Sequence, residues 1–218
     1  MNLLTCLSRR GQNHPLVQTP NILELTSNSS IAIDFLDREF SNVDDIGIAF
    51  VYFDDARTVT AEDIIGSLVK HLVHRRGNPS QDLTDLYSQH TERRTHPTYL
   101  ELSMILETEA REFSKVFVVI DALDECPVRN DTRTKILTEL SKLSTVRVMI
   151  TGRPHVTAVV LSSLGEVCQV QIRARDEDID KYTEERIHLN ENLSRHCLRS
   201  EGLEETIRQT VVSKAGGM

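Results

Sequence analysis

The sequence predicts an α/β fold in which helices cover a parallel β-sheet on both faces. Residues 46–53 and 116–123 are nearly continuous apolar runs, as expected for strands that are buried on both sides. Further strands are predicted over 146–151 and, with a weaker pattern, over 167–172. Helical patterns lie between these strands, and such alternation is typical of parallel sheets with helical crossovers.

The helices are predicted from apolar spacing and from capping residues. Thr60 with Asp63 resembles a helix start, and Ile64, Leu68 and Leu72 then repeat along one face. Thr98 and Glu101 have the spacing of a capping box. Helices are therefore expected over 30–40, from Thr60, from Thr98, over 131–143, from Asp176 and from about Leu203. The polar stretch 75–97 is predicted to be a loop with helical turns, and residues 1–29 an irregular segment.

Composition excludes several classes of protein. The 218 residues carry 25 Lys and Arg against 33 Asp and Glu, and this net charge of -8 argues against a nucleic-acid binder that needs a basic face. Aromatic residues make up only 5% and Trp is absent, so base-stacking platforms are not expected. No apolar run approaches the roughly 20 residues that cross a bilayer. We expect no nucleic acid and no membrane among the partners.

The cysteine and histidine residues predict neither a disulfide framework nor a metal centre. Four cysteines are far apart in the sequence and form no C-x-x-C pair. A reducing, cytoplasmic location is the expectation that follows from this usage. His71 and His74 lie three residues apart, yet no four-ligand zinc spacing accompanies them.

The segment that ends the second predicted strand carries the chemistry. In a parallel sheet, ligands bind beyond the carboxyl ends of the strands, and Asp121 would lie there. A carboxylate at that edge suits Mg²⁺ together with phosphate oxygens, and Glu125 is placed to orient or deprotonate a water molecule. The alternative interpretation is a solvated acidic loop that follows a core strand.

Three segments carry a resemblance to a known family. They are FVVIDALDEC (117–126), TGRP (151–154) and DEDIDKYTEERI (176–187), and the strand 46–53 with the helix 60–72 also fits. Together they resemble the NACHT-type nucleotide-binding domain of STAND-class P-loop NTPases. The resemblance extends over about 30–218 and is closest to fungal receptor-like proteins with a nephrocystin-like NACHT module.

The resemblance implies a three-layer P-loop NTPase-like core and assigns roles to four residues. Asp121 resembles the Walker B aspartate, which binds Mg²⁺ only together with nucleotide. Asp124 and Glu125 resemble the additional acids of the NACHT pattern, with Glu125 the candidate for water activation. Arg153 lies where the family has a sensor arginine. Complete relatives would bind Mg-ATP or Mg-GTP.

The phosphate-binding loop is not recognisable. A P-loop needs G-x-x-x-x-G-K-[ST], in which glycine backbone amides and a lysine hold the phosphates. No glycine lies between Gly11 and Gly47, and the first lysine is Lys70. Thr26 lies near the expected Ser/Thr position but follows Glu24 and Leu25, and an acid there would repel phosphate. We therefore expect no cofactor in this chain and an incomplete first strand.

Three hypotheses follow from this combination. The expected organisation is an irregular segment over 1–29, a partial NACHT core over 30–173 and a truncated helical extension over 174–218. The chain is either a signalling module without hydrolysis that acts in interaction or scaffolding, or an active NTPase whose P-loop is missing from this gene model. A truncated product that folds poorly is the third hypothesis, because an incomplete sheet exposes a strand edge. Receptor-like or NACHT-type proteins are the expected partners, and the sequence leaves the oligomeric state open.

Overall fold

The fold is described here from a computed structural model of the whole chain. The structure describes residues 2–6, 29–54, 59–127, 129–165, 167–172 and 175–215. Contacts divide the chain into a core unit, residues 3–170, and a C-terminal unit of residues 171–218 with the first two residues. The two units are described separately below.

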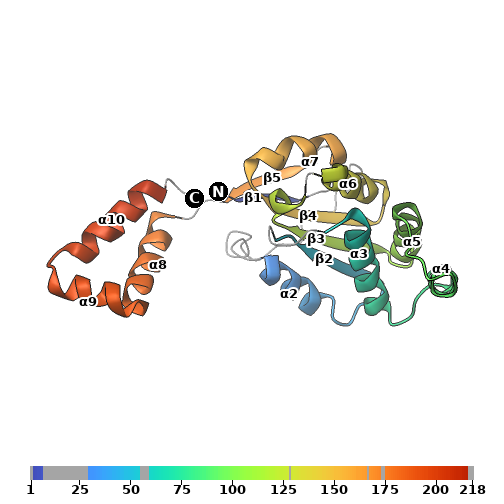
Figure 1. Cartoon of the computed structure of the whole chain (residues 1–218), viewed down its shortest axis with the longest axis horizontal. Helices are drawn as coiled ribbons and strands as arrows, with labels where there is room; N and C mark the ends of the chain where they lie inside the picture. Colours follow the sequence, from blue (N-terminus) through green and yellow to red (C-terminus); the bar gives the residue numbers. More distant parts are fainter. Residues whose placement is uncertain are drawn as a thin grey trace. The chain divides into compact units, whose positions relative to one another are not determined.

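A five-stranded sheet forms the centre of the core unit (Figure 1). The strands β2 (Ile46–Tyr52), β3 (Lys115–Asp121) and β4 (Val146–Gly152) pair in parallel. Strand β1 (Asn2–Cys6) runs antiparallel to β4, and β5 (Cys168–Ile172) follows β1 in the order β2-β3-β4-β1-β5. The three parallel strands confirm the predicted mixed α/β class.

Strand β1 corrects one expectation. Residues 1–29 were expected to be irregular, yet Asn2–Cys6 pairs with β4 along four registered positions from Leu3↔Gly152 to Cys6↔Met149. The segment NLLTC is short, and apolar and polar residues do not alternate in it as in a half-buried strand. Its strand conformation depends on pairing with a distant partner, which local sequence does not reveal.

Side chains on β3 alternate between the two faces of the sheet. Val116, Val118 and Ile120 enter the main apolar cluster, together with residues of α3 (Ala61–Arg76), α5 (Tyr99–Arg111) and α6 (Thr132–Lys142). On the opposite face the Phe117 ring stacks on Phe40, which follows α2 (Ser29–Glu39), with ring centroids 5.5 Å apart. Helices therefore cover both faces, and the period-2 pattern of β3 supplies both layers.

The predicted helix starts are confirmed at two positions. At α3 the Thr60 hydroxyl accepts from the Asp63 backbone N–H, and the Asp63 carboxylate accepts from the Thr60 N–H, which is a complete capping box. Thr98 and Glu101 make the same reciprocal bonds at the start of α5. Each cap satisfies backbone donors that a helix start otherwise leaves unpaired.

The stretch 75–97 was predicted to be a loop, and this was wrong. Helix α4 (Gln81–Arg93) occupies most of it, with Ser80 as its N-cap and Arg94 in the left-handed region at its C-cap. The helix has few apolar residues, and none of its side chains is fully buried. The polar composition of this stretch did not indicate a continuous helix, although its caps define both helix ends.

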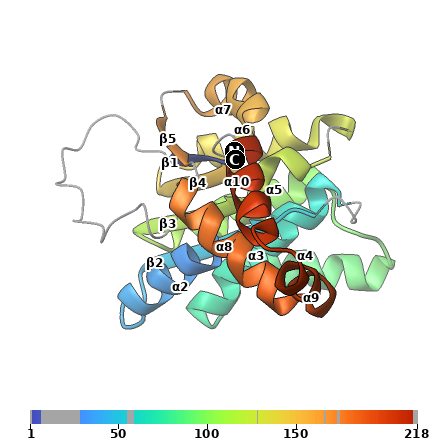
Figure 2. The same ribbon diagram turned by 90° about the vertical axis from the view of Figure 1, so that its left-hand side faces the viewer.

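Within residues 175–215, the described helical part of the C-terminal unit, three helices lie where two were predicted. They are α8 (Asp176–Leu189), α9 (Glu191–Arg199) and α10 (Leu203–Ala215), and α8 packs against α10 (Figure 2). The Arg208 guanidinium joins these two helices, because its Nε lies 2.7 Å from Asp180 Oδ1. In the core unit, α7 (Thr157–Leu164) follows β4 and was also not predicted.

Candidate functional site

Asp121 lies at the carboxyl end of β3, as the sequence predicted, and Thr151 of β4 contacts it. The register pairs Ile120 with Ile150, so the two following residues are neighbours across the ladder. The Thr151 hydroxyl donates to Asp121 Oδ1 at 2.6 Å and accepts from the Ala122 backbone N–H at 3.0 Å. One hydroxyl thus fixes the carboxylate and the turn that follows it.

A second hydroxyl reaches the same carboxylate oxygen from a distant segment. Ser29, the first residue of α2, is buried and donates its hydroxyl proton to Asp121 Oδ1. Sequence reasoning had placed the candidate hydroxyl at Thr26, which lies outside the described residues. The available signal was a serine that opens the apolar helix SSIAIDFL, a position where a hydroxyl can face the sheet edge.

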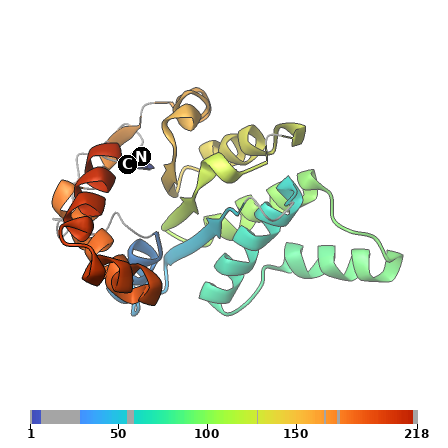
Figure 3. The same ribbon diagram turned by 60° about the vertical axis from the view of Figure 1, so that its left-hand side comes forward.

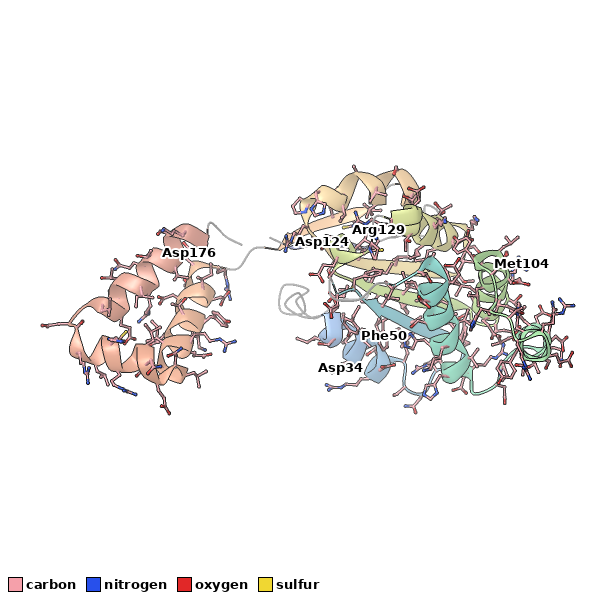
Figure 4. The ribbon with its side chains drawn as sticks, viewed as in Figure 1. Asp34, Phe50, Met104, Asp124, Arg129 and Asp176 are labelled. Atoms are coloured by element: carbon pink, nitrogen blue, oxygen red, sulfur yellow. The ribbon has the colours of Figure 1, made fainter. Side chains whose placement is uncertain are left out.

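Asp124 holds the segment that follows β4 (Figure 4). Its Oδ1 accepts from the Arg153 backbone N–H at 3.2 Å, and its Oδ2 lies 3.2 Å from the Arg153 Nε. Gly152 permits this approach, because a Cβ there would lie 3.3 Å from Asp124 Oδ1 and 3.1 Å from Val156 Cγ2. The structure therefore brings Asp124 and Arg153 together as an ion pair, in which the Asp124 side chain is 9% exposed and that of Arg153 68%.

The turn after β3 has an unusual backbone that Arg133 supports. Ala122 has φ 54°, in the left-handed region that few non-glycine residues adopt. The Arg133 guanidinium donates to the carbonyl oxygens of Asp124 at 3.0 Å and of Cys126 at 2.9 Å. Strained backbone of this kind persists only where surrounding contacts hold it. Sequence reasoning did not single out Arg133, which lies in the following helix.

The acidic residues at this edge differ in their surroundings. Glu125 ends the short 3-10 turn Leu123–Glu125 and is partly exposed, and its carboxylate has no hydrogen bond or ion pair within the described part of the chain. Tyr52, the last residue of β2, pairs in register with Asp121. Partial burial raises the pKa of the Tyr52 phenol, and the negative charges of Asp121 and Asp34 raise it further. The edge is thus rich in negative charge, with Arg153 paired to Asp124 and Arg133 bound to the carbonyl oxygens of the turn.

Cys126 is a packing residue in the turn that follows β3. It is 1% exposed, and burial raises the pKa of its thiol to about 11 despite the nearby Arg133. A thiol of this kind is protonated near neutral pH and inert. Among the residues that the structure describes, no group of three or more His, Cys, Asp or Glu side chains is arranged to hold a metal ion.

Comparison with protein families identifies the core of this chain. A family model described as nephrocystin 3, N-terminal, matches residues 26–153. The chain belongs to the nephrocystin 3 N-terminal family. The matched range contains Ser29, Asp121, Asp124 and Thr151 and ends at Arg153, so the whole edge described above lies within the family domain.

The other comparisons add nothing to this nephrocystin-type assignment. No curated protein and no solved structure matches the chain. None of the helices in the described ranges combines the length and apolar character that crossing a membrane requires.

Proposed function

We propose that the chain is a NACHT-type signalling module with a P-loop NTPase-like core, which has lost nucleotide hydrolysis and acts in interaction or scaffolding within a receptor-like system. The observation that carries this proposal is the Ser29–Asp121–Thr151 cluster at the carboxyl end of β3. A hydroxyl at a helix start that faces a strand-end aspartate is the arrangement by which P-loop proteins hold Mg²⁺.

The position of Ser29 allows the P-loop pattern to be placed on this sequence. If Ser29 occupies the last position of G-x-x-x-x-G-K-[ST], then Ile22 and Ser27 stand in place of the glycines and Asn28 in place of the lysine. In this alignment Ser29 supplies the hydroxyl of the pattern, while other residues replace the glycines and the lysine that would bind phosphate. This supports a nucleotide site that has lost its anion-binding part.

The residues present fit Mg²⁺ only in company with a phosphate. Mg²⁺ prefers octahedral oxygen ligands and is usually bound by one or two protein groups, several waters and phosphate oxygens. Asp121 and Ser29 supply such oxygens, and both lie at the sheet edge where a ligand would bind. When bound, the ion would neutralise phosphate charge, and Asp121 and Ser29 would position it.

The absence of the P-loop lysine and glycines from the sequence before Ser29 is the basis of the proposed loss of function. Charge-assisted hydrogen bonds are worth roughly 1.5–3 kcal/mol each, so losing several of them costs several kcal/mol of phosphate binding. The edge keeps the carboxylates Asp121, Asp124 and Glu125, and without a cradle they repel a polyphosphate. We expect neither tight nucleotide binding nor turnover from this chain.

Hydrolysis assays test this proposal. With Mg²⁺ and either ATP or GTP, we expect phosphate release by the wild-type chain to equal that of the Glu125→Gln variant, because neither positions a nucleotide. Turnover above that of the variant would contradict the proposal.

The second candidate is an active NTPase whose P-loop lies in sequence absent from this gene model. The retained Ser29–Asp121 contact favours it, since a cluster with no remaining ligand has no evident reason to keep its geometry. Mapping transcripts upstream of Asn28 distinguishes the two candidates. In-frame codons for GKS or GKT joined to this region would favour the enzyme.

A further inference from the structure

Helix α4 carries a stripe that the rest of the core unit covers only in part, because Leu83 and Leu86 pack half-buried against the main apolar cluster while Tyr87 stays open. Leu83, Leu86, Tyr87 and His90 follow the i, i+3, i+4, i+7 spacing of one helix face. Such a face is normally buried, yet no side chain of α4 is fully buried and Tyr87 is 71% exposed. Figure 3 shows the green helix α4 at the margin of the core unit, joined by extended segments on both sides.

The helix is held firmly at both ends, so the open stripe is not a product of fraying. The Ser80 hydroxyl caps its start, and the Ser80 backbone N–H donates to the fully buried Glu109 carboxylate at 2.9 Å. At its other end His90 Nδ1 lies 2.7 Å from the Thr95 hydroxyl oxygen. Polar contacts therefore anchor both ends of α4, and of its apolar face Leu83 and Leu86 are half-buried against the core whereas Tyr87 is exposed.

Two adjoining hollows lie along this face, and together we call them the α4 groove. Their volumes are about 440 Å³ and about 540 Å³, and Leu83 and Leu102 line both. Leu86, Tyr87 and Pro97 line the first, and Val69 and Val73 of α3 line the second. The groove runs between α4 and its neighbours α3 and α5, and its lining is mostly apolar.

The charges of the α4 groove are opposite to that of the whole chain. Its lining contains Lys70, Arg94 and three histidines, and no carboxylate among the described residues. The chain as a whole has a net charge of -8. The carboxylate of Glu101, 3.4 Å from His90 Nε2, lies beside the lining and is already paired. An apolar floor with cationic edges is complementary to an apolar ligand that carries negative charge.

We propose that the α4 groove docks an acidic amphipathic helix of a partner protein. Leucine or aromatic anchors at i, i+3, i+4 and i+7 of that helix would contact Leu83, Leu86 and Leu102, in the manner of helix-in-groove recognition. Lys70 and Arg94 would face its carboxylates. The docking inference rests on the interaction role proposed above and names a surface for it. The lining of the α4 groove shares no residue with the Asp121 edge.

The absence of tryptophan from the chain provides a clean reporter. In a Tyr87→Trp variant of the full chain, all tryptophan emission comes from the groove. Three synthetic helical peptides serve as probes: one with leucines at i, i+3, i+4, i+7 and glutamates elsewhere, one with lysines replacing the glutamates, and one with the leucine positions scrambled. We expect a saturable emission change with the first peptide only, and weaker binding at high ionic strength.

Variants assign the binding to this surface. In the Tyr87→Trp background, Leu86→Glu is expected to weaken the acidic peptide at least about tenfold, and Arg94→Asn about threefold or more. Asparagine suits Arg94 because that residue has φ 52°. Leu198→Glu and Arg199→Asn in α9 are the matched controls, since both positions are exposed and outside the groove. Circular dichroism melting shows which variants remain folded.

The outcomes separate the groove from the nucleotide proposal. No saturable binding of the acidic peptide, equal binding of the lysine peptide, or binding that folded Leu86→Glu leaves unchanged would each overturn the docking inference. The Mg-ATP and Mg-GTP assays above are independent of all three results, so a failed groove leaves the lost-hydrolysis proposal standing. If the chain binds the acidic peptide and also turns over nucleotide, only the lost-hydrolysis proposal is overturned.

Discussion

At the scale of single residues, Asp121 accepts hydrogen bonds from two hydroxyl groups, those of Ser29 and Thr151. Thr151 supplies one of them and also accepts from the Ala122 N–H. From the sequence, Asp121 and Glu125 were predicted as site residues because they lie at or just after the end of an apolar strand, and Asp124 and Arg153 were added by the family resemblance. Sequence reasoning did not identify Ser29 or Thr151, since their contacts depend on strand register and on a pairing 92 residues apart.

We predict that Thr151→Val destabilises the chain by about 1–3 kcal/mol. Valine keeps the shape but leaves the partly buried Asp121 carboxylate and the Ala122 N–H each short of a partner, and such losses cost about this much. Urea unfolding of the variant measures the change. Thr138→Val, at an exposed position of α6, is the control and should change the free energy of unfolding by less than about 0.5 kcal/mol. Equal effects of both substitutions would contradict the role given to Thr151.

His71 links α3 to the terminal strand β2 through a bond that protonation breaks. Its Nδ1 accepts from the Phe50 backbone N–H at 3.3 Å, and its ring stacks on that of Phe50 with centroids 4.2 Å apart. An acceptor Nδ1 requires the neutral ring. Burial lowers the pKa of His71 below its ordinary value of 6.5, and the nearby charges of Lys70 and His74 lower it further.

Stability should therefore fall in acid through His71. As pH decreases below about 6.5, the unfolded chain binds a proton at this histidine before the folded chain does, so the free energy of unfolding decreases until the folded pKa is passed. We expect a His71→Asn variant to lose less stability than wild type on going from pH 7 to acid, measured by urea unfolding. His155→Asn, at an exposed position, should follow the wild-type pH dependence. A wild-type slope in the His71 variant would contradict this account.

At the scale of elements, Glu109 connects α5 to α4 and α3. Its side chain is fully buried, its Oε1 accepts from the Ser80 N–H, and its Oε2 lies 3.4 Å from the Arg76 guanidinium. Glu109 lies in the apolar face of α5, where a carboxylate needs a polar partner. The sequence does not reveal that this partner is the start of α4, because that contact depends on how the helices pack.

Replacing Glu109 should loosen α4 more than any other element. We expect Glu109→Ala to cost about 1–3 kcal/mol, because it leaves the Ser80 N–H without its acceptor, while Arg76 keeps its ion pair with Glu112 at 3.1 Å. Glu109→Gln should cost less, since its amide oxygen still accepts from Ser80. Hydrogen exchange is expected to show the largest loss of protection in residues 81–93. Uniform loss across α3, α4 and α5 would contradict the anchoring role.

The strands and helices differ in how far sequence could predict them. Strands β2 and β3 were predicted from nearly unbroken apolar runs, β4 from its β-branched residues, whose burial alternates along the strand, and α3 and α5 from caps that are local. Helix α4 and strand β1 were not, since α4 buries too little surface to need a strong apolar pattern and β1 depends on a partner about 145 residues away.

At the scale of the whole molecule, we propose that a carboxylate edge is retained in a chain whose sequence lacks the phosphate-binding residues of a P-loop. Asp121 accepts hydrogen bonds from Ser29 and Thr151, and this cluster is the part of the site that the proposal assigns to Mg²⁺. The sequence before Ser29 has neither the glycines nor the lysine of a P-loop. The fold and the charged edge were accessible from sequence, whereas the assignment of Ser29 needed the three-dimensional arrangement.

Isothermal titration of the full chain with Mg-ATP tests this claim most directly. We predict no saturable heat at micromolar nucleotide, and the same result for Asp121→Asn, because the sequence before Ser29 lacks the P-loop glycines and lysine that would bind the phosphates in either protein. Binding of Mg-ATP with micromolar affinity that Asp121→Asn abolishes would contradict the account, since it would place a working phosphate grip beside Asp121.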